Sequence, residues 1–203
     1  KANTRNIYSL AAPELLGLPN VGSAKEFDLE GCIALKPDLV ILPIKLKDQI
    51  KVLEDMGIRV IGVNPENTKL LAEMIIMIGK LTGVENYQKL LDFYDRVETD
   101  IYKTINKNNI PKVYLGGNSS FFLTATGRMY QNDLIKTAGG HNVASNIEDT
   151  YWAEISYEQL IQFNPEYIII APGATYSKED ILRDSNLSSI SAIINKKVYE
   201  MPS

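Results

Sequence analysis

Cysteine is almost absent from this 203-residue chain, which contains only Cys32. A single cysteine excludes an internal disulfide and the cysteine clusters that hold structural zinc or iron–sulfur centres. Long apolar runs are also missing, since no stretch approaches the roughly 20 residues that a membrane-spanning helix needs. No signal peptide begins at Lys1. With 45% hydrophobic residues, the chain has the composition of a globular protein with an ordinary buried core.

Positive charge is scarce and scattered. The 21 Lys and Arg residues against 25 Asp and Glu give a net charge of -4, and no basic run occurs, so nothing predicts nucleic-acid binding. Catalytic signatures are missing as well: no nucleophile elbow, paired catalytic carboxylates or Ser–His arrangement is evident. These absences count against an enzyme, while an α/β enzyme and a sensor domain stay open as alternatives.

Two stretches of the chain repeat one pattern. They are DLEGCIALKPDLVILP, residues 28–43, and SYEQLIQFNPEYIIIAPG, residues 156–173. In each, an apolar segment with helical spacing ends at a proline, Pro37 or Pro165, because proline cannot continue a helix. A continuous apolar run follows, which predicts a strand of a parallel sheet covered by helices. The repetition predicts two similar α/β lobes.

Helical and strand patterns alternate along the rest of the chain. Ser156 and Gln159 form a capping box, which predicts a helix start. The spacing predicts helices over 48–56, 68–81 and 178–182, and strands over 39–42, 59–63, 112–115, 167–171 and 197–201. The predicted fold class is α/β: two Rossmann-like lobes with mainly parallel sheets, joined by one long α-helix.

The predicted joining helix lies in ENYQKLLDFYDRVETDIYKTINKNN, residues 85–109. Apolar residues follow one stripe at helical spacing, and neither proline nor glycine interrupts it. Such a helix would span roughly 35 Å at 1.5 Å per residue, long enough to cross a small domain. We therefore predict a first lobe over 1–83, the linking helix within 84–110, and a second lobe over 111–203.

Several segments, in order, closely resemble the substrate-binding proteins of ABC importers for ferric siderophores, haem and cobalamin. They are ALKPDLVIL, GIRVIGVNPEN, IGKLTGVENYQKLLDFYD, PKVYLGGNSSFFLTATGRMYQNDLIKTAGGHNVAS, YWAEISYEQLIQFNPEYIIIAPGA and KKVYEMPS. The resemblance implies two lobes bridged by one long helix, a ligand in the cleft between them, and delivery to an ABC permease and ATPase. It also implies a periplasmic protein or a cell-surface lipoprotein, with the targeting segment outside this sequence and contact with the membrane only through a tether or the permease.

The resemblance also implies that the chain is truncated at both ends. Family members begin with a further strand and helix before the segment that matches Ile7–Gly22. They continue into further helices after the segment that matches Val198–Ser203. We therefore expect an incomplete first lobe and a second lobe without its final helices.

Ligands of parallel α/β sheets bind outside the carboxyl ends of the strands, where the loops carry polar side chains. The loops after the predicted strands, together with the family resemblance, lead us to predict a ligand-binding set made of Lys45, Asn64, Asn118, Ser119, Ser120, Arg128, Tyr130, Trp152 and Tyr176. A ferric siderophore is the favoured ligand, because Lys45, Arg128 and Tyr130 suit an anionic chelate. Haem and cobalamin stay open.

Each of these positions also has an interpretation without a ligand. Trp152, expected in a loop just before the capping box, either packs on a planar ligand or fills the core of its own lobe. Arg128 is either a ligand contact or a surface residue, and Tyr130 either a donor or a packing residue at a helix start. The glycines and small polar residues of 116–120 either approach a ligand closely or form a tight turn.

Metal binding by the protein itself is not predicted. No Cys or His cluster has metal-ligand spacing, so any iron is expected inside a chelator, and no resident cofactor is expected. His141, in AGGHNVAS, is interpreted as a turn residue, with an axial haem ligand as the alternative. Cys32 is expected to be buried.

Permease docking in the resembling family uses an acidic residue from each lobe. Glu179 and Asp180 are the candidates in the second lobe, and Asp48, beside Lys47, is the candidate in the first. The alternative is that these acids only stabilise the helix dipole at a helix start.

Overall fold

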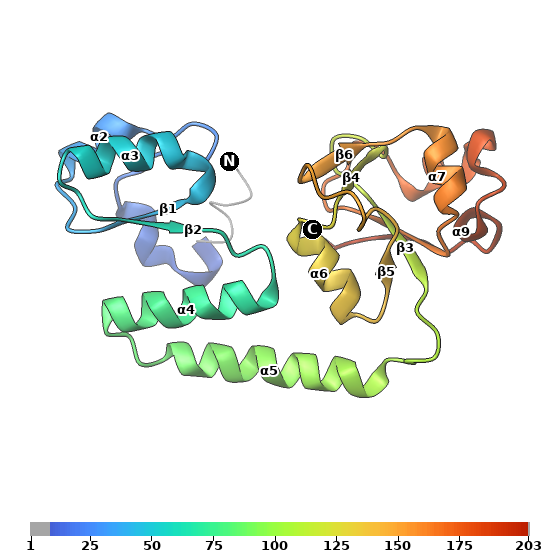
Figure 1. Ribbon diagram of the computed structural model, residues 1–203, viewed down its shortest axis with the longest axis horizontal. Coiled ribbons are helices and arrows are strands. Elements are labelled where there is room, and N and C mark those ends of the chain that lie inside the picture. The colour runs from blue at the N-terminus through green and yellow to red at the C-terminus, as the bar shows by residue number, and fades with distance from the viewer. Residues whose placement is uncertain (1–8, 203) are drawn as a thin grey trace. The chain divides into compact units, whose positions relative to one another are not determined.

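The computed structural model describes residues 9–202, so residues 1–8 and Ser203 lie outside the described part of the chain. The segment Ile7–Gly22, which matches the resembling family, therefore begins outside the described residues. The predicted second lobe over 111–203 ends outside them. The chain divides after Asn64 into two compact units, which run from blue to cyan and from green to red in Figure 1. The predicted lobes at 1–83 and 111–203, with a link at 84–110, stay a prediction.

The first unit contains a small parallel sheet with helices packed on it. Its elements are a 3-10 helix at Pro13–Gly17, α2 (Leu29–Ala34), β1 (Val40–Pro43), a 3-10 helix at Ile44–Leu46, α3 (Lys47–Asp55) and β2 (Val60–Val63). In the sheet, Val40 of β1 pairs with Val60 of β2. The core contains Cys32, as predicted, and Leu53, which has no exposed surface. Burial, together with the charge of Asp28, raises the pKa of the Cys32 thiol.

Local signals explain the boundaries of this unit. The Asp28 side chain accepts a hydrogen bond from Gly31 N at 2.9 Å and starts α2. After α3, Gly57 has φ +80°, a left-handed conformation that glycine adopts without strain, so the chain turns directly into β2. The predicted helices and strands of this unit are confirmed to within one or two residues.

The second unit is larger and is built on one mixed sheet. Its elements are α4 (Thr68–Thr82), α5 (Tyr87–Thr104), β3 (Lys112–Gly116), β4 (Leu123–Ala125), α6 (Tyr130–Thr137), β5 (His141–Asn142), β6 (Trp152–Glu154), α7 (Tyr157–Phe163), β7 (Tyr167–Ile170), α8 (Lys178–Arg183), a 3-10 helix at Ser185–Leu187, α9 (Ser191–Ile194) and β8 (Val198–Glu200). The strand order is β6-β4-β3-β7-β8, with β5 also paired to β3. Strands β3, β5, β7 and β8 run parallel, while β4 and β6 are antiparallel to their neighbours.

Helices α4 and α5 open the second unit, and both pack against α6 (Figure 1). Helix α4 begins after Asn67, whose side chain accepts a hydrogen bond from Leu70 N at 2.8 Å. It ends at Gly83, which has φ +69°. The Thr68 N–H donates to Asp133 Oδ2 at 2.8 Å, which ties the first turn of α4 to α6. The predicted helix over 68–81 is confirmed.

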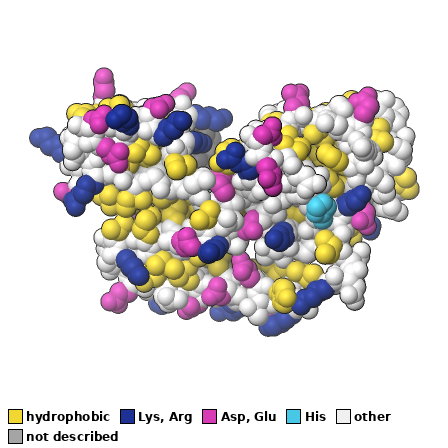
Figure 2. Space-filling view, viewed as in Figure 1, with side chains coloured by type: hydrophobic (Ala, Val, Ile, Leu, Met, Phe, Trp, Pro, Cys, Tyr) yellow, Lys and Arg dark blue, Asp and Glu magenta, His cyan; other side chains and the backbone are white. Residues whose placement is uncertain are grey.

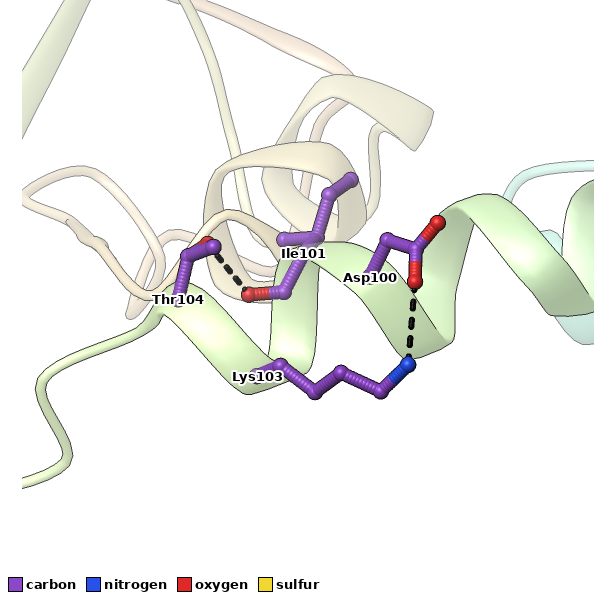
Figure 3. Close-up of polar contacts among 4 residues, drawn as sticks. All are labelled: Asp100, Ile101, Lys103 and Thr104. Carbon is purple, nitrogen blue, oxygen red and sulfur yellow. Dashed lines mark hydrogen bonds and ion pairs between the residues drawn. The ribbon is translucent and has the colours of Figure 1, made fainter.

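Helix α5 ends at Thr104 and is therefore shorter than the segment over 85–109 in which the sequence predicts a helix. Figure 3 shows its last turn, where the Thr104 hydroxyl donates to the Ile101 carbonyl at 2.7 Å and an exposed lysine–aspartate pair lies on the same turn. The next residue, Ile105, is extended and lies against Gly139. Asparagines dominate the following residues and are poor helix formers, so the helix has no reason to continue.

One face of the sheet of the second unit is buried, and the other is covered only in part, since Tyr167 and Ile169 of β7 are half-buried and Tyr199 of β8 is 52% exposed. Alternate residues of β3 and β7, such as Tyr114 and Ile168, face a core formed with α7, α8 and α9. Their neighbours Val113, Leu115 and Ile169 face a second cluster that includes Ile135 of α6. Side chains of β3 and β7 thus join apolar clusters on both faces of the sheet, which explains the continuous apolar runs in the sequence. No helix within residues 9–202 is long and apolar enough to span a bilayer.

Surface charge is mixed. On the face shown in Figure 2, Lys and Arg side chains are interspersed with Asp and Glu side chains, without a large patch of one sign. His141, the only histidine of the chain, is exposed and lies in β5 opposite Lys112.

Candidate functional site

Two loops meet at the carboxyl ends of β3 and β7, the edge where parallel sheets bind ligands. The Thr175 N–H donates to the Asn118 carbonyl at 3.0 Å, and the Tyr176 hydroxyl donates to the Gly117 carbonyl at 2.7 Å. The Ala171 N–H donates to the Gly116 carbonyl at 3.0 Å. These three bonds hold the loops after β3 and β7 together as one structured edge.

Tyr176 is half-buried at this edge. Its ring contacts the Phe121 ring edge-to-face at a centroid distance of 5.7 Å. Burial raises the pKa of Tyr176 to about 12, so the hydroxyl keeps its proton. Because a phenol has one proton to donate and Gly117 receives it, the Tyr176 hydroxyl acts on the loop and offers a ligand only its acceptor lone pairs.

Replacing Tyr176 with phenylalanine is expected to loosen the edge without unfolding the unit. The Gly117 carbonyl would lose its donor, which costs about 1 kcal/mol of unfolding free energy. Hydrogen exchange at the Thr175 amide, measured by mass spectrometry, should become faster. Tyr199→Phe is the matched control, because Tyr199 is 52% exposed. Unchanged exchange at Thr175 would show that the hydroxyl does not hold the loops.

Glycines allow the backbone of this edge to pack closely. A Cβ on Gly117 would lie 2.5 Å from the Leu123 carbonyl oxygen, and one on Gly116 would lie 2.6 Å from the Tyr176 hydroxyl. Asn118 and Ser119 are exposed, whereas the Ser120 hydroxyl accepts a hydrogen bond from Phe122 N at 3.2 Å. The tight-turn interpretation therefore explains the glycines, and the exposed Asn118 and Ser119 side chains remain available to a ligand.

Trp152 does not lie in a loop, and that prediction is wrong. It is the first residue of β6 and pairs with Ala125 of β4. Its ring is half-buried against the cluster that contains Leu115 and Ile135, and its Cζ3 atom would lie 3.4 Å from a Cβ on Gly117. The three-residue strand escaped prediction because WAE has no strand periodicity. Trp152 thus packs partly into the core of its own unit, next to the structured edge.

Arg128 lies against an aromatic ring that the sequence did not single out. Its guanidinium carbon is 4.5 Å from the centroid of the Tyr151 ring, and Nη2 is 3.5 Å from the Tyr151 hydroxyl oxygen. Both side chains are exposed. The pairing of β4 with β6 brings these residues together, and no local pattern in the sequence could have shown it.

Tyr130, the first residue of α6, lies in different surroundings from Arg128. Burial is the main cause that raises the pKa of Tyr130, followed by the nearby Tyr94 and the carboxylates of Asp133 and Glu98. The Tyr130 side chain is half-buried near Tyr94 and Glu98 of α5, which agrees with the packing interpretation. Arg128 and Tyr130 are close in sequence but face different neighbours.

The predicted residues of the first unit lie where its strands end. Lys45 lies in the 3-10 helix after β1, Asp48 lies in the first turn of α3, and Asn64 directly follows β2. All three are exposed. They belong to the first unit, whereas the other predicted residues belong to the second.

The acids at the start of α8 differ in what they contact. The Ser177 N–H donates to Asp180 Oδ2 at 2.8 Å and the Asp180 N–H donates to the Ser177 hydroxyl at 3.2 Å, and these two bonds form a capping box. The bond from the Ser177 backbone is the main cause that lowers the pKa of Asp180. The Asp180 carboxylate therefore caps the start of α8, and both Glu179 and Asp180 are exposed. Among residues 9–202, no three His, Cys, Asp or Glu side chains gather as a metal site.

Comparison with known proteins gives a consistent family. A family model described as periplasmic binding protein matches residues 3–203. The chain is 26% identical over 159 residues to the high-affinity heme uptake system protein IsdE of Staphylococcus aureus (strain bovine RF122 / ET3-1), covering 76% of this chain and 54% of that protein. It is 26% identical over 172 residues to the vitamin B12-binding protein of Salmonella choleraesuis (strain SC-B67), covering 81% of this chain and 62% of that protein. The chain thus spans a little over half the length of these curated relatives.

Solved structures show the same fold. The periplasmic heme binding protein HutB of Vibrio cholerae superposes with a TM-score of 0.76 at 21% identity, covering 93% of this chain and 77% of that one. An ABC transporter substrate-binding protein of Listeria monocytogenes EGD-e gives a TM-score of 0.76 at 22% identity, covering 94% and 77%. The predicted fold class, α/β with mainly parallel sheets, is confirmed.

Proposed function

The chain belongs to the periplasmic binding protein family, and from this premise we propose that it captures a metal chelate outside the cytoplasmic membrane and passes it to an ABC permease and its ATPase. The family assignment makes it a binding protein rather than an enzyme. In this proposal the protein is periplasmic or tethered to the cell surface by a lipid.

The proposed ligand is an anionic chelate, with a ferric siderophore as the favoured case. The observation that carries this proposal is the exposed Arg128 guanidinium, which forms no ion pair with any carboxylate among residues 9–202. A guanidinium binds carboxylate or catecholate oxygens through paired N–H donors. Haem or cobalamin is the second candidate, because the relatives carry these ligands in their names.

The proposed contacts keep the positions predicted from the sequence. They are Asn118, Ser119, Ser120, Arg128, Tyr130, Trp152 and Tyr176 in the second unit, with Lys45 and Asn64 in the first. Asp48, Glu179 and Asp180 remain the proposed docking acids, and of the two at the start of α8 only Asp180 takes part in the capping box.

Titration of Trp152 fluorescence tests the proposal. Trp152 is the only tryptophan and lies beside the loop at Gly117, so a bound ferric chelate or haem should quench it saturably. Ferric siderophores, haem and cobalamin are titrated in parallel, with the iron-free siderophore and Trp152→Phe as controls. A saturable quench by one ligand class identifies the ligand. The absence of saturable binding of any of them, confirmed by calorimetry, would contradict the proposed function.

A further inference from the structure

We propose that Tyr151 is a positioning residue that holds the Arg128 guanidinium ready for an anionic ligand. The inference rests on the proposed function, since it concerns how that ligand is recognised. It follows from a side-chain pair between the turn after β4 and the residue that precedes β6, rather than from either residue alone.

The pair itself is an exposed cation–π contact. The Arg128 guanidinium carbon is 4.5 Å from the Tyr151 ring centroid, within the range where the negative face of the ring attracts a cation. The 3.5 Å separation between Nη2 and the hydroxyl oxygen is too long for a strong hydrogen bond. The ring is therefore the main partner, and the planar N–H donors of the guanidinium stay available to a ligand.

The backbone beneath the pair is fixed by one buried residue. Thr126 has no exposed surface, and its hydroxyl donates to the Thr150 carbonyl at 2.6 Å and lies 3.1 Å from the Tyr151 carbonyl oxygen. The Arg128 N–H donates to the same hydroxyl at 3.3 Å, and the Thr126 N–H donates to the Tyr151 carbonyl at 3.2 Å. Thr126 thus contacts the main chain of both members of the pair. The two exposed side chains project from a rigid base.

This arrangement favours one class of ligand. A free arginine side chain loses rotamer freedom when it binds, and a side chain already seated on a ring loses less. Since the guanidinium is exposed and forms no ion pair with the described residues, its N–H donors can pair with an anionic ligand in place of water. An anionic chelate with carboxylate or catecholate oxygens gains from this preorganisation, whereas a neutral hydroxamate chelate gains little.

Variants of the full chain distinguish the contribution of the Tyr151 ring to ligand binding from that of the Arg128 charge. Arg128→Ala should weaken binding of an anionic ferric tris-catecholate by about tenfold or more, and leave a neutral ferric trihydroxamate almost unaffected. Tyr151→Ala should weaken the anionic chelate by roughly two- to fivefold. Tyr151→Phe should bind like the original chain, because the ring remains. Circular dichroism checks that each variant is folded, which is expected for exposed positions.

The outcomes distinguish the inference from the proposed function. If Arg128→Ala weakens the anionic chelate and Tyr151→Ala does not, the positioning role is wrong and the proposed function stands. If Tyr151→Phe is as weak as Tyr151→Ala, the hydroxyl contacts the ligand and the positioning role is again wrong. If the original chain binds neither chelate, nor haem or cobalamin, the proposed function fails and the inference fails with it.

Discussion

Replacing Leu160 with alanine is expected to destabilise the second unit by about 2–5 kcal/mol, the usual cost of a cavity in a closed core. Leu160 has no exposed surface and lies on α7 in the cluster that contains Ile168 of β7 and Val198 of β8. The side chain joins the helix to the sheet, so its truncation leaves a void that neighbouring strands cannot fill. Urea unfolding followed by Trp152 fluorescence measures the effect, because this only tryptophan lies in the second unit.

The next residue along α7 provides a matched control. Ile161 is 39% exposed, so Ile161→Ala should cost only about 0.5–1 kcal/mol. The two variants remove aliphatic groups from neighbouring positions of one helix, and only their burial differs. Equal losses of unfolding free energy would show that α7 does not present Leu160 to the sheet.

The helix–strand repeats could be predicted because their signals are local. The capping box of Ser156 and Gln159 is present in the structure, and it starts α7 where the sequence placed it. Continuous apolar runs identify β1 and β7 because both faces of these strands meet side chains. Hydrogen bonds within a few residues and side-chain spacing carry this information, and both can be read from the printed sequence.

Strands β4 and β6 could not be predicted, because tertiary pairing alone defines them. Each has three residues, too few for a periodic pattern, and their pairing places side by side residues such as Ala125 and Trp152 that are distant in sequence. This pairing places Trp152 in a strand and brings Tyr151 to Arg128. The contact between Arg128 and Tyr151 depends on this pairing, so sequence analysis could not predict it.

The edge at β3 and β7 is an intermediate case. The rule that ligands lie outside the carboxyl ends of parallel strands identified the loops that contain Asn118 and Tyr176. It could not show that the Tyr176 hydroxyl is bonded to Gly117, since that bond depends on how two loops pack. Similarly, the sequence placed Asp180 at a helix start, but it could not show whether the carboxylate caps the helix or docks to a permease.

Replacing Gly117 with alanine is expected to strain this edge strongly. The Gly117 N–H donates to the Leu123 carbonyl at 2.7 Å, and an added Cβ would lie only 2.5 Å from that same oxygen. Backbone cannot move aside as a flexible side chain can, so we expect a cost of about 1–3 kcal/mol in unfolding free energy. Urea unfolding followed by Trp152 fluorescence measures it.

The same substitution should weaken ligand binding, because the shifted backbone displaces Asn118 and its bond to Thr175. Strain from the methyl group favours a displaced loop that does not bind the chelate. If returning the loop to its binding position costs about 1.4 kcal/mol, the dissociation constant of the chelate rises about tenfold. Gly17→Ala is the control, since nothing lies within 4 Å of a Cβ at Gly17. Original stability and affinity in Gly117→Ala would mean that the edge adapts to the methyl group, and that its glycines do not set the position of the ligand contacts.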